Sequence, residues 1–502
     1  MPTPLKPFTI PGPGVFGLNT QGDVTTDSFD WATTADNCVY DEFGRLTSRK
    51  GWVKLTATPL AGAPNMNQLF EYKVNSSLTI IISAAGNKLY HGTTTLTEIT
   101  GALTPTGDDW NFQNFNGKVV GWQAGHTPIV WANTGNFANI VVSDGGTLPD
   151  GPACLSAFGR MWAFDDDRTT LRYSGLLNET QWAVASGGGS IDLRSNKAAA
   201  HTGLDFGVAL AEFNGRLIVL MSNTVLIYTG ASDPTTMVLE DVLPGMGSAA
   251  RDSVQSIGND LLWLDRSGVV GLVRALESGS MPNRTYTERV RDDLQAELFS
   301  SGIGPIRSCY NKKDGFYGLA GDPFVWVFDT KAPLEDGTFR ATKWNSIEPR
   351  SWHFASDNKL YLAKDGVVAE YTGYQDNAAS YVMKWVSNWS RMGSEQIKII
   401  KKIEAILSHI GQYTPTFSLG YDYVSGVFTV RAVSGTTGGV SEWNVAEWGI
   451  GEWGAVKAHN RVRVNGGKDG TYVQVGIQSG INSQSLSIQN LRLLFKLGRI
   501  SR

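Results

Sequence analysis

The sequence predicts an all-β protein, a β-propeller of about seven blades joined to a β-rich platform formed by the N- and C-terminal segments. Three observations carry this prediction. A short phrase of turn and buried strand recurs through the middle of the chain, 57 of the 502 residues are glycine, and 41% are apolar and fall in short runs. Repeats of roughly 40–50 residues built from short strands are typical of propeller blades.

The clearest copy of the phrase spans residues 213–220, followed by a tight turn and a strand at 225–228. A turn signal and a basic residue precede an almost wholly apolar strand, as expected for an inner strand packed on both faces. Other copies begin at Tyr72, Phe115, Phe158, Ile257, Tyr310 and Phe354. We therefore expect the propeller over residues 65–375, with six or eight blades left open because ring closure is not visible in sequence.

The strand after each apolar strand often ends in an aromatic residue, and large aromatics suit the gaps between adjacent blades. These residues are Tyr90, Trp131, Tyr173, Tyr228, Phe328 and Tyr371. One stretch breaks the repeat. Val290, Leu294 and Leu298 share a helical face, which predicts an amphipathic helix packed on the propeller between two blades.

Residues 1–64 precede the repeats and form part of the predicted platform. The first 34 contain five prolines, which fix the backbone and remove hydrogen-bond donors, so we expect an extended arm lying on another surface or subunit. A hairpin should follow, with strands at 38–40 and 45–49 around a turn at 41–44.

Residues 376–502 lack the phrase and supply the rest of the platform. The β-branched run at 396–407 favours a long strand over a helix. From Arg391 onward, 13 Lys and Arg stand against 7 Asp and Glu, a net charge of +6 that leaves −10 on the remainder. Such a split favours ordered docking between oppositely charged surfaces, although a segment of this length can also reach that charge without purpose.

A Glu-Trp pair repeats every five residues at residues 442–453, which fits neither a helix nor a strand. We expect a loop carrying Trp443, Trp448 and Trp453. Exposed indoles would seek a partner surface, and a loop folded onto its own domain would bury them; the two outcomes are equally open.

Motifs for chemistry are lacking in the sequence. Two matches to GxGxxG, at Gly12 and Gly449, do not follow a strand and open a helix, as dinucleotide binding requires. The six histidines are scattered, and three distant cysteines suggest neither a disulfide framework nor a zinc site but a reducing compartment. We expect no signal peptide and no membrane-spanning helix.

The two ends of the chain carry the most informative motifs. At the N-terminal end these are residues 37–40 (NCVY), 44–46 (GRL) and 49–52 (RKGW), and at the C-terminal end 461–464 (RVRV), 470–475 (GTYVQV) and 496–499 (KLGR). In this order around a propeller they resemble the tail nozzle proteins of short-tailed phages, which include the tail tubular and packaged-DNA stabilisation proteins.

The resemblance implies a homohexameric structural ring of the virion tail, made in the host cytoplasm and docked on the portal adaptor (the head-to-tail connector). Tail fibre or spike proteins would be neighbours. Double-stranded DNA would be retained and then pass through the lumen without sequence recognition, and the protein would be no enzyme, with no catalytic, cofactor or metal residues. Candidate assembly contacts are Arg45, Arg49, Trp52, Lys401, Lys402, Trp443, Trp448 and Trp453.

Two other functions stay open from the sequence. A propeller polysaccharide hydrolase or lyase would need carboxylates that converge from loops in one cleft. A carbohydrate-binding, receptor-recognition tail protein would use the three tryptophans of the 442–453 loop as a stacking platform.

Overall fold

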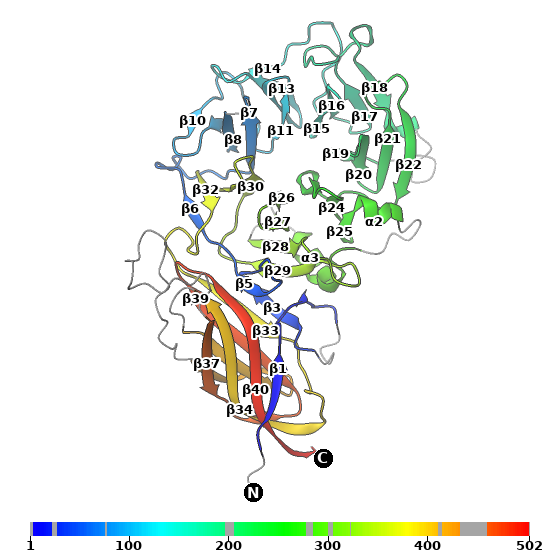
Figure 1. Cartoon of the computed structure of the whole chain (residues 1–502). Helices are drawn as coiled ribbons and strands as arrows, with labels where there is room; N and C mark the ends of the chain where they lie inside the picture. Colours follow the sequence, from blue (N-terminus) through cyan, green and yellow to red (C-terminus); the bar gives the residue numbers. More distant parts are fainter. Residues whose placement is uncertain are drawn as a thin grey trace, which may run out of the picture.

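The chain forms a ring of small β-sheets with a pair of larger, elongated sheets attached to one side of the ring (Figure 1). The computed structural model describes residues 4–22, 28–75, 78–195, 205–277, 285–299, 305–321, 323–409, 414–431 and 459–500. We call the ring the propeller and the larger pair of sheets the platform.

Seven sheet units follow one another around the propeller within the described residues; six contain four strands and one contains three. The first four units consist of β7 (Gln68–Lys73), β8 (Thr79–Ala85), β9 (Lys88–His91), β10 (Thr97–Glu98); β11 (Asn111–Phe115), β12 (Lys118–Gln123), β13 (His126–Trp131), β14 (Ala138–Asn139); β15 (Cys154–Ala157), β16 (Arg160–Phe164), β17 (Thr170–Tyr173), β18 (Gly189–Asp192); and β19 (Gly207–Phe213), β20 (Arg216–Met221), β21 (Thr224–Thr229), β22 (Val238–Pro244). The others consist of β23 (Gln255–Ser256), β24 (Leu261–Asp265), β25 (Gly268–Gly271); β26 (Arg307–Asn311), β27 (Phe316–Gly321), β28 (Phe324–Asp329), β29 (Arg340–Trp344); and β30 (Ser351–Phe354), β31 (Leu360–Lys364), β32 (Val367–Tyr371) with β6 (Trp52–Lys54).

Each copy of the repeated phrase marks the turn between the first and second strands of a unit. Between β19 and β20, Asn214 and Gly215 have φ values of 50° and 74°. Asn116 and Gly117 repeat this geometry with 48° and 72°. Two successive positive φ values are what a type I′ hairpin turn requires, which explains the Asn-Gly pairs. The propeller fold predicted from the repeat is confirmed.

Strand β6, from the N-terminal part of the chain, completes the last unit of the ring. It pairs antiparallel with β32, with Trp52 opposite Tyr371. This pairing corrects the prediction that residues 1–64 belong wholly to the platform, because residues 52–54 are part of the propeller. A three-residue strand carries no periodic signal, and its partner lies at the far end of the repeats.

The hydrophobic core of the propeller lies between neighbouring units. Tyr72 of the first unit packs near Trp131 of the second, with 5.6 Å between ring centroids. Apolar clusters of the same kind fill the spaces between the other units. The predicted inter-blade aromatics lie in these clusters: Tyr90, Trp131, Tyr173, Tyr228, Phe328 and Tyr371.

Helices are few. The predicted amphipathic helix is present as α3 (Arg291–Leu298), with Leu294 and Leu298 buried and Val290 buried just before it. The other helical segments among the described residues are α2 (Leu272–Glu277), η1 (Val184–Ser186), η2 (Leu193–Ser195), η3 (Arg251–Ser253) and η4 (Glu288–Val290). Among the described residues, none of the helices has the length and apolar character needed to cross a membrane.

The platform combines both ends of the chain in two sheets. The first contains β1 (Lys6–Ile10), β4 (Cys38–Tyr40), β5 (Leu46–Ser48), β34 (Gln396–His409), β37 (His459–Asn465), β38 (Asp469–Gly470) and β40 (Leu486–Ile500). The second contains β2 (Gly17–Leu18), β3 (Trp31–Asp36), β33 (Tyr381–Ser387), β35 (Thr416–Tyr421), β36 (Val424–Arg431) and β39 (Val473–Ile481). Their apolar faces form one core, and the long strand expected from residue 396 is β34.

The platform is continuous with the propeller. Strand β3 pairs in parallel with β29, at Asp36 and Lys343, so the second platform sheet and one blade form a ten-stranded sheet. The predicted hairpin is also present, with β4 and β5 paired and Cys38 opposite Ser48. A shared sheet holds the platform at a fixed position on one side of the ring.

Candidate functional site

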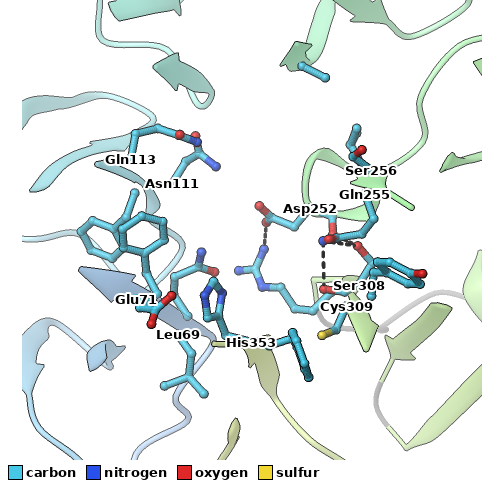
Figure 2. Close-up of a pocket in the computed structure, with 18 of the residues that line it drawn as sticks. Leu69, Glu71, Asn111, Gln113, Asp252, Gln255, Ser256, Ser308, Cys309 and His353 are labelled. Carbon is cyan, nitrogen blue, oxygen red and sulfur yellow. Dashed lines mark hydrogen bonds and ion pairs between the residues drawn. The ribbon is translucent and has the colours of Figure 1, made fainter. Parts of the chain in front are cut away.

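A cavity of about 820 Å³ lies on the axis of the propeller, and the first strand of every unit contributes to its wall (Figure 2). The far ends of three of these strands carry the exposed residues Lys73, Glu212 and Lys312, so the cavity opens to solvent there. We call this space the axial cavity. A cavity of this size falls within the range of about 300–1,000 Å³ that is common for ligand sites.

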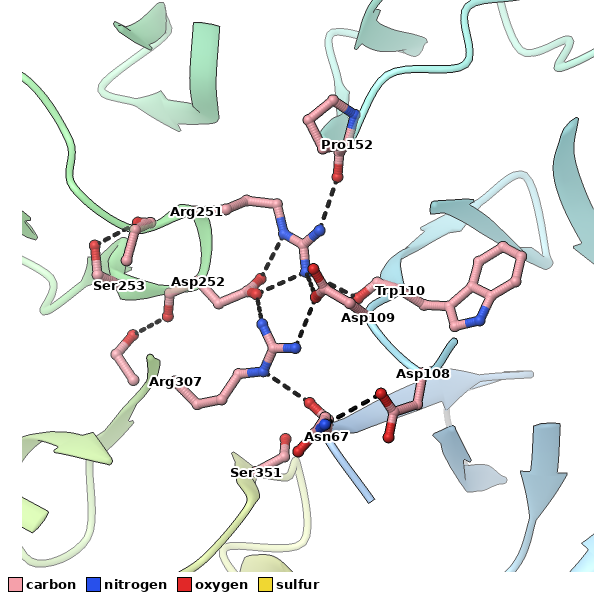
Figure 3. A network of polar contacts seen from close by, with 12 residues as sticks. Asn67, Asp108, Asp109, Trp110, Pro152, Arg251, Asp252, Ser253, Arg307 and Ser351 are labelled. Atoms are coloured by element: carbon pink, nitrogen blue, oxygen red, sulfur yellow. Dashed lines mark hydrogen bonds and ion pairs between the residues drawn. The ribbon is translucent and has the colours of Figure 1, made fainter. Parts of the chain in front are cut away.

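Two arginines and two aspartates close the other end of the axial cavity (Figure 3). The Arg251 guanidinium lies 2.7 Å from a carboxylate oxygen of Asp109 and 2.7 Å from one of Asp252. Arg307 lies 2.7 Å from Asp109 and pairs with Asp252 as well. Each cation thus contacts both anions. We call these four side chains the axial ion network.

The axial ion network joins segments that lie at the starts of the first strands of five units. Beyond the four charged residues, Arg307 donates to the carbonyl of Asn67 at 2.7 Å, and Arg251 donates to that of Pro152 at 2.9 Å. A second cavity of about 410 Å³ is lined partly by the same side chains. The network therefore borders both cavities and bridges the propeller between segments of five units.

Three members of the axial ion network are buried or nearly so, whereas Asp109 is 58% exposed. Burial alone would raise the pKa of Asp109, but the charges of Arg251 and Arg307 hold it below its ordinary value. Burial lowers the pKa of Arg307, and the Asp109 carboxylate opposes that change. Because Arg307 is only 4% exposed, removing a partner would leave an unpaired charge in a poorly hydrated site.

Glu71 and His353 lie on the side of the axial cavity opposite Gln255 and Ser308 (Figure 2). The Glu71 carboxylate accepts hydrogen bonds from the backbone N–H of Ser356 at 3.0 Å and from its hydroxyl. Burial lowers the pKa of His353 to about 4, so its imidazole is neutral near pH 7. The two residues thus present a carboxylate held by neutral donors and a neutral imidazole to the cavity.

A second candidate surface lies on the first platform sheet, where three arginines surround one carboxylate. Arg461 and Arg463 on β37 lie 2.6 Å and 2.8 Å from Glu404 on β34, and Arg492 on β40 lies 3.9 Å away. The hydrogen bond from Arg461, with the charges of the other two arginines, holds the pKa of Glu404 below its ordinary value against the opposing effect of burial. Three cations around one anion leave an excess of positive charge.

This group, with Lys402, forms what we call the basic face. The predicted contacts Lys401 and Lys402 are both exposed on β34, and Lys402 pairs across the sheet with Asn465 and Leu494. The three arginines are 42–56% exposed. Their guanidinium groups therefore remain available to a partner.

The other predicted contacts have different environments. Arg45 is half-buried and pairs with Asp41 at 2.7 Å. Arg49 is fully buried and bound to Asp376, so it cannot contact another subunit directly. Trp52 is a half-buried part of the last propeller unit, with Lys364 4.7 Å from its ring centre. Trp443, Trp448 and Trp453 lie outside the described residues.

Sequence reasoning missed the axial ion network and one exposed aromatic. Phe43, at the tip of the hairpin between β4 and β5, is 76% exposed and lies beside Arg45. Its place in a predicted turn was a usable signal, because a large apolar residue is unusual there. Asp109, Arg251 and Arg307 carried no such signal, since only closure of the ring brings them together.

The described residues contain no cluster of three or more His, Cys, Asp or Glu side chains arranged to hold a metal ion. The three successive aspartates at residues 165–167 lie in a turn, with Asp165 bound to Arg172 and Asp167 bound to Thr169 and Thr170. In the axial cavity, Asp252 is paired with arginines and Glu71 is bound to Ser356. These are the arrangements of structural carboxylates.

No family model matches the sequence, and no curated protein matches it. Among solved structures, the chain is similar to the WD40 β-propeller domain of Doa1, with 9% identity over 63% of this chain and 95% of that one and a TM-score of 0.39. It is also similar to the WD40 domain of Neurospora crassa Pan2, with 10% identity over 65% and 95% and a TM-score of 0.37.

A third similar structure is PorZ, a bacterial surface component of the type-IX secretion system of Porphyromonas gingivalis. Identity is 12% over 63% of this chain, the TM-score is 0.36, and the chain spans 37% of the length of that structure. The strand pairing described above establishes the propeller independently of these likenesses.

Proposed function

We propose that this protein is a subunit of a hexameric tail nozzle of a short-tailed phage, a structural ring that docks on the portal adaptor. In this role it retains packaged DNA and then forms the channel for its ejection. Tail fibre or spike proteins would attach to the ring. The protein acts by assembly and carries out no reaction.

One observation carries the proposal: strands from both ends of the chain pair in the first platform sheet, which holds the motifs at 37–40, 461–464 and 496–499. Strand β1 pairs with β40 from Lys6 to Ile10, and β40 meets β5 at Ser487 and Thr47. The buried pair of Arg49 and Asp376 links the third N-terminal motif to the chain segment that leaves the propeller. Motifs remote in sequence thus form a single unit, as a docking platform requires.

The basic face supports docking on an acidic partner. Arg461, Arg463 and Arg492 lie on neighbouring strands of the first platform sheet and share one carboxylate. Oppositely charged surfaces raise association rates and fix orientation more than they raise affinity. We expect this face to meet the adaptor ring.

Side chains block the centre of the propeller, which limits where DNA could pass. The axial ion network occupies the axis, and the narrow cavity on one side of it is about 820 Å³. A duplex therefore cannot pass through a single propeller. In a nozzle the channel would run between subunits, which makes oligomerisation a condition of function.

Charge reversal on the basic face tests the proposal. The double variant Arg461→Glu/Arg463→Glu should lose binding to purified adaptor ring in sedimentation at moderate salt. Arg266→Glu, an exposed arginine of the propeller, is the matched control and should bind as the original protein does. Equal binding by both variants, or no binding by the original protein, would contradict the proposal.

A further inference from the structure

The hairpin between β35 and β36 has a tyrosine at a turn position that favours glycine. Its two turn residues are Asp422 and Tyr423, with φ values of 48° and 68°. In two hairpin turns of the propeller with the same pair of positive φ values, the second position is held by Gly117 and Gly215. A bulky side chain at positive φ is strained, and such strain persists in proteins mostly where a function requires the side chain.

Neighbouring rings and hydrogen bonds hold Tyr423 in place. Its ring centroid lies 5.4 Å from that of Trp389 and 4.8 Å from that of Tyr472. The Asp422 carboxylate accepts hydrogen bonds from the backbone N–H groups of Thr471 and Tyr472, at 2.8 Å and 2.9 Å. The tyrosine ring is therefore restrained before any partner binds, which lowers the entropy lost on binding.

The restrained ring is still open to solvent. Tyr423 is 46% exposed and the next residue, Val424, is 61% exposed. The guanidinium of Arg391 lies 5.1 Å from the ring centre of Tyr472. We call Trp389, Tyr423, Val424 and Tyr472 the platform tip. Tryptophan, tyrosine and arginine are the residue types that contribute most binding energy at protein interfaces.

The platform tip lies at the end of the second platform sheet that is farther from the ring. Strand β33 begins at Tyr381, after the chain leaves the propeller, and ends at Ser387, two residues before Trp389. The tip also adjoins the strand that carries the basic face. Strand β38, which precedes Tyr472, pairs with the first part of β34, and Lys402 lies further along β34.

From these features we propose that Tyr423 anchors the platform on the adaptor ring by inserting into an apolar pocket beside the acidic surface that the basic face meets. This inference rests on the proposed function and names the residue that holds the docked state. Attraction between exposed charges mainly raises the association rate, whereas a buried aromatic anchor slows dissociation. The basic face and the platform tip therefore act on different rate constants.

Biolayer interferometry of the full chain on immobilised adaptor ring, at low and high salt, measures both rate constants. Tyr423→Gly removes the ring and supplies the residue that the turn favours, so the hairpin should still form. We expect dissociation to become about tenfold faster or more at both salt concentrations. Phe299→Ser removes an aromatic ring of 44% exposure from the propeller and is the matched control, which should dissociate as the original protein does. Thermal melting of both variants checks that they fold.

The outcomes separate this inference from the proposed function. Arg461→Glu/Arg463→Glu should act mainly on the association rate, and more at low salt, because salt screens exposed charges. If the original protein docks and Tyr423→Gly dissociates at the original rate, the inference is overturned and the proposed function stands. If the original protein does not dock, both are overturned. If Tyr423→Gly weakens self-association in sedimentation velocity and leaves docking unchanged, the tip is a contact between copies, which also overturns the inference.

Discussion

Arg49 and Asp376 form a buried, two-pronged ion pair, with distances of 2.8 Å and 2.7 Å between the guanidinium nitrogens and the two carboxylate oxygens. Arg49 lies in the N-terminal segment just before β6, and Asp376 follows the last propeller strand. Asn37 accepts a further hydrogen bond from the Nε of Arg49 at 2.9 Å. The pair therefore fixes the point at which the chain enters and leaves the propeller.

Arg49→Met should destabilise the whole chain by about 3–5 kcal/mol, because it leaves Asp376 buried without its cation. Urea unfolding followed by tryptophan fluorescence measures this change. Arg45→Met is the control, since its pair with Asp41 is partly exposed and lies within one hairpin turn, so its loss should be smaller than that of Arg49→Met. If Arg49→Met lowers the free energy of unfolding by less than 1 kcal/mol, the buried Arg49–Asp376 pair does not stabilise the chain as we expect.

Arg307→Gln should loosen the closure of the ring, because Asp109 and Asp252 then repel each other with only Arg251 between them. We expect a loss of about 3–5 kcal/mol and faster amide exchange at the starts of the first strands. Arg194→Gln, at an exposed pair, should change neither. Equal amide exchange rates in the two variants would show that the axial ion network does not hold the propeller ring closed.

The titration of His353 predicts a dependence of stability on pH. Its pKa is about 4 in the folded protein, below the ordinary value of 6.5, because burial disfavours the charged imidazole. The unfolded chain then binds a proton that the folded chain refuses as pH falls below 6.5. The free energy of unfolding is therefore unaffected by His353 above pH 6.5. It falls progressively as the pH decreases from 6.5 to about 4.

Urea midpoints measured between pH 4 and 7 for the original protein and for His353→Gln isolate this effect. Glutamine has no proton to gain, so the variant should lose less stability across that window. The difference between the two curves should grow as the pH falls from 6.5 towards 4. Parallel curves would show that His353 is not held neutral.

We expect the exposed ring of Phe43 to contact a neighbouring subunit. Its substitution should therefore weaken association without changing the stability of the single subunit. The ring of Phe43 is 76% exposed, so Phe43→Ser should leave the urea midpoint unchanged. In the proposed hexamer it should weaken association, which sedimentation velocity at several concentrations measures. A variant that assembles as the original protein does would remove the hairpin tip from the interface.

The sequence anticipated features whose causes are local. The turns at Asn116–Gly117 and Asn214–Gly215 depend on residues that tolerate positive φ, so the strands around them were predictable. The burial of Arg49 was not predictable, because Asp376 is brought to it only by the closed ring. The axial ion network was unpredictable for the same reason, because only the closed ring brings its residues together. Ring closure also places Trp52 in a blade, where a subunit contact was expected.

The nozzle assignment is tested most directly by electron microscopy of the purified full-length protein mixed with its adaptor ring. The proposed function predicts six-fold rings on the adaptor, with the platforms towards it and a central channel between the propellers. A monodisperse monomer that gains no symmetry from the adaptor would contradict it.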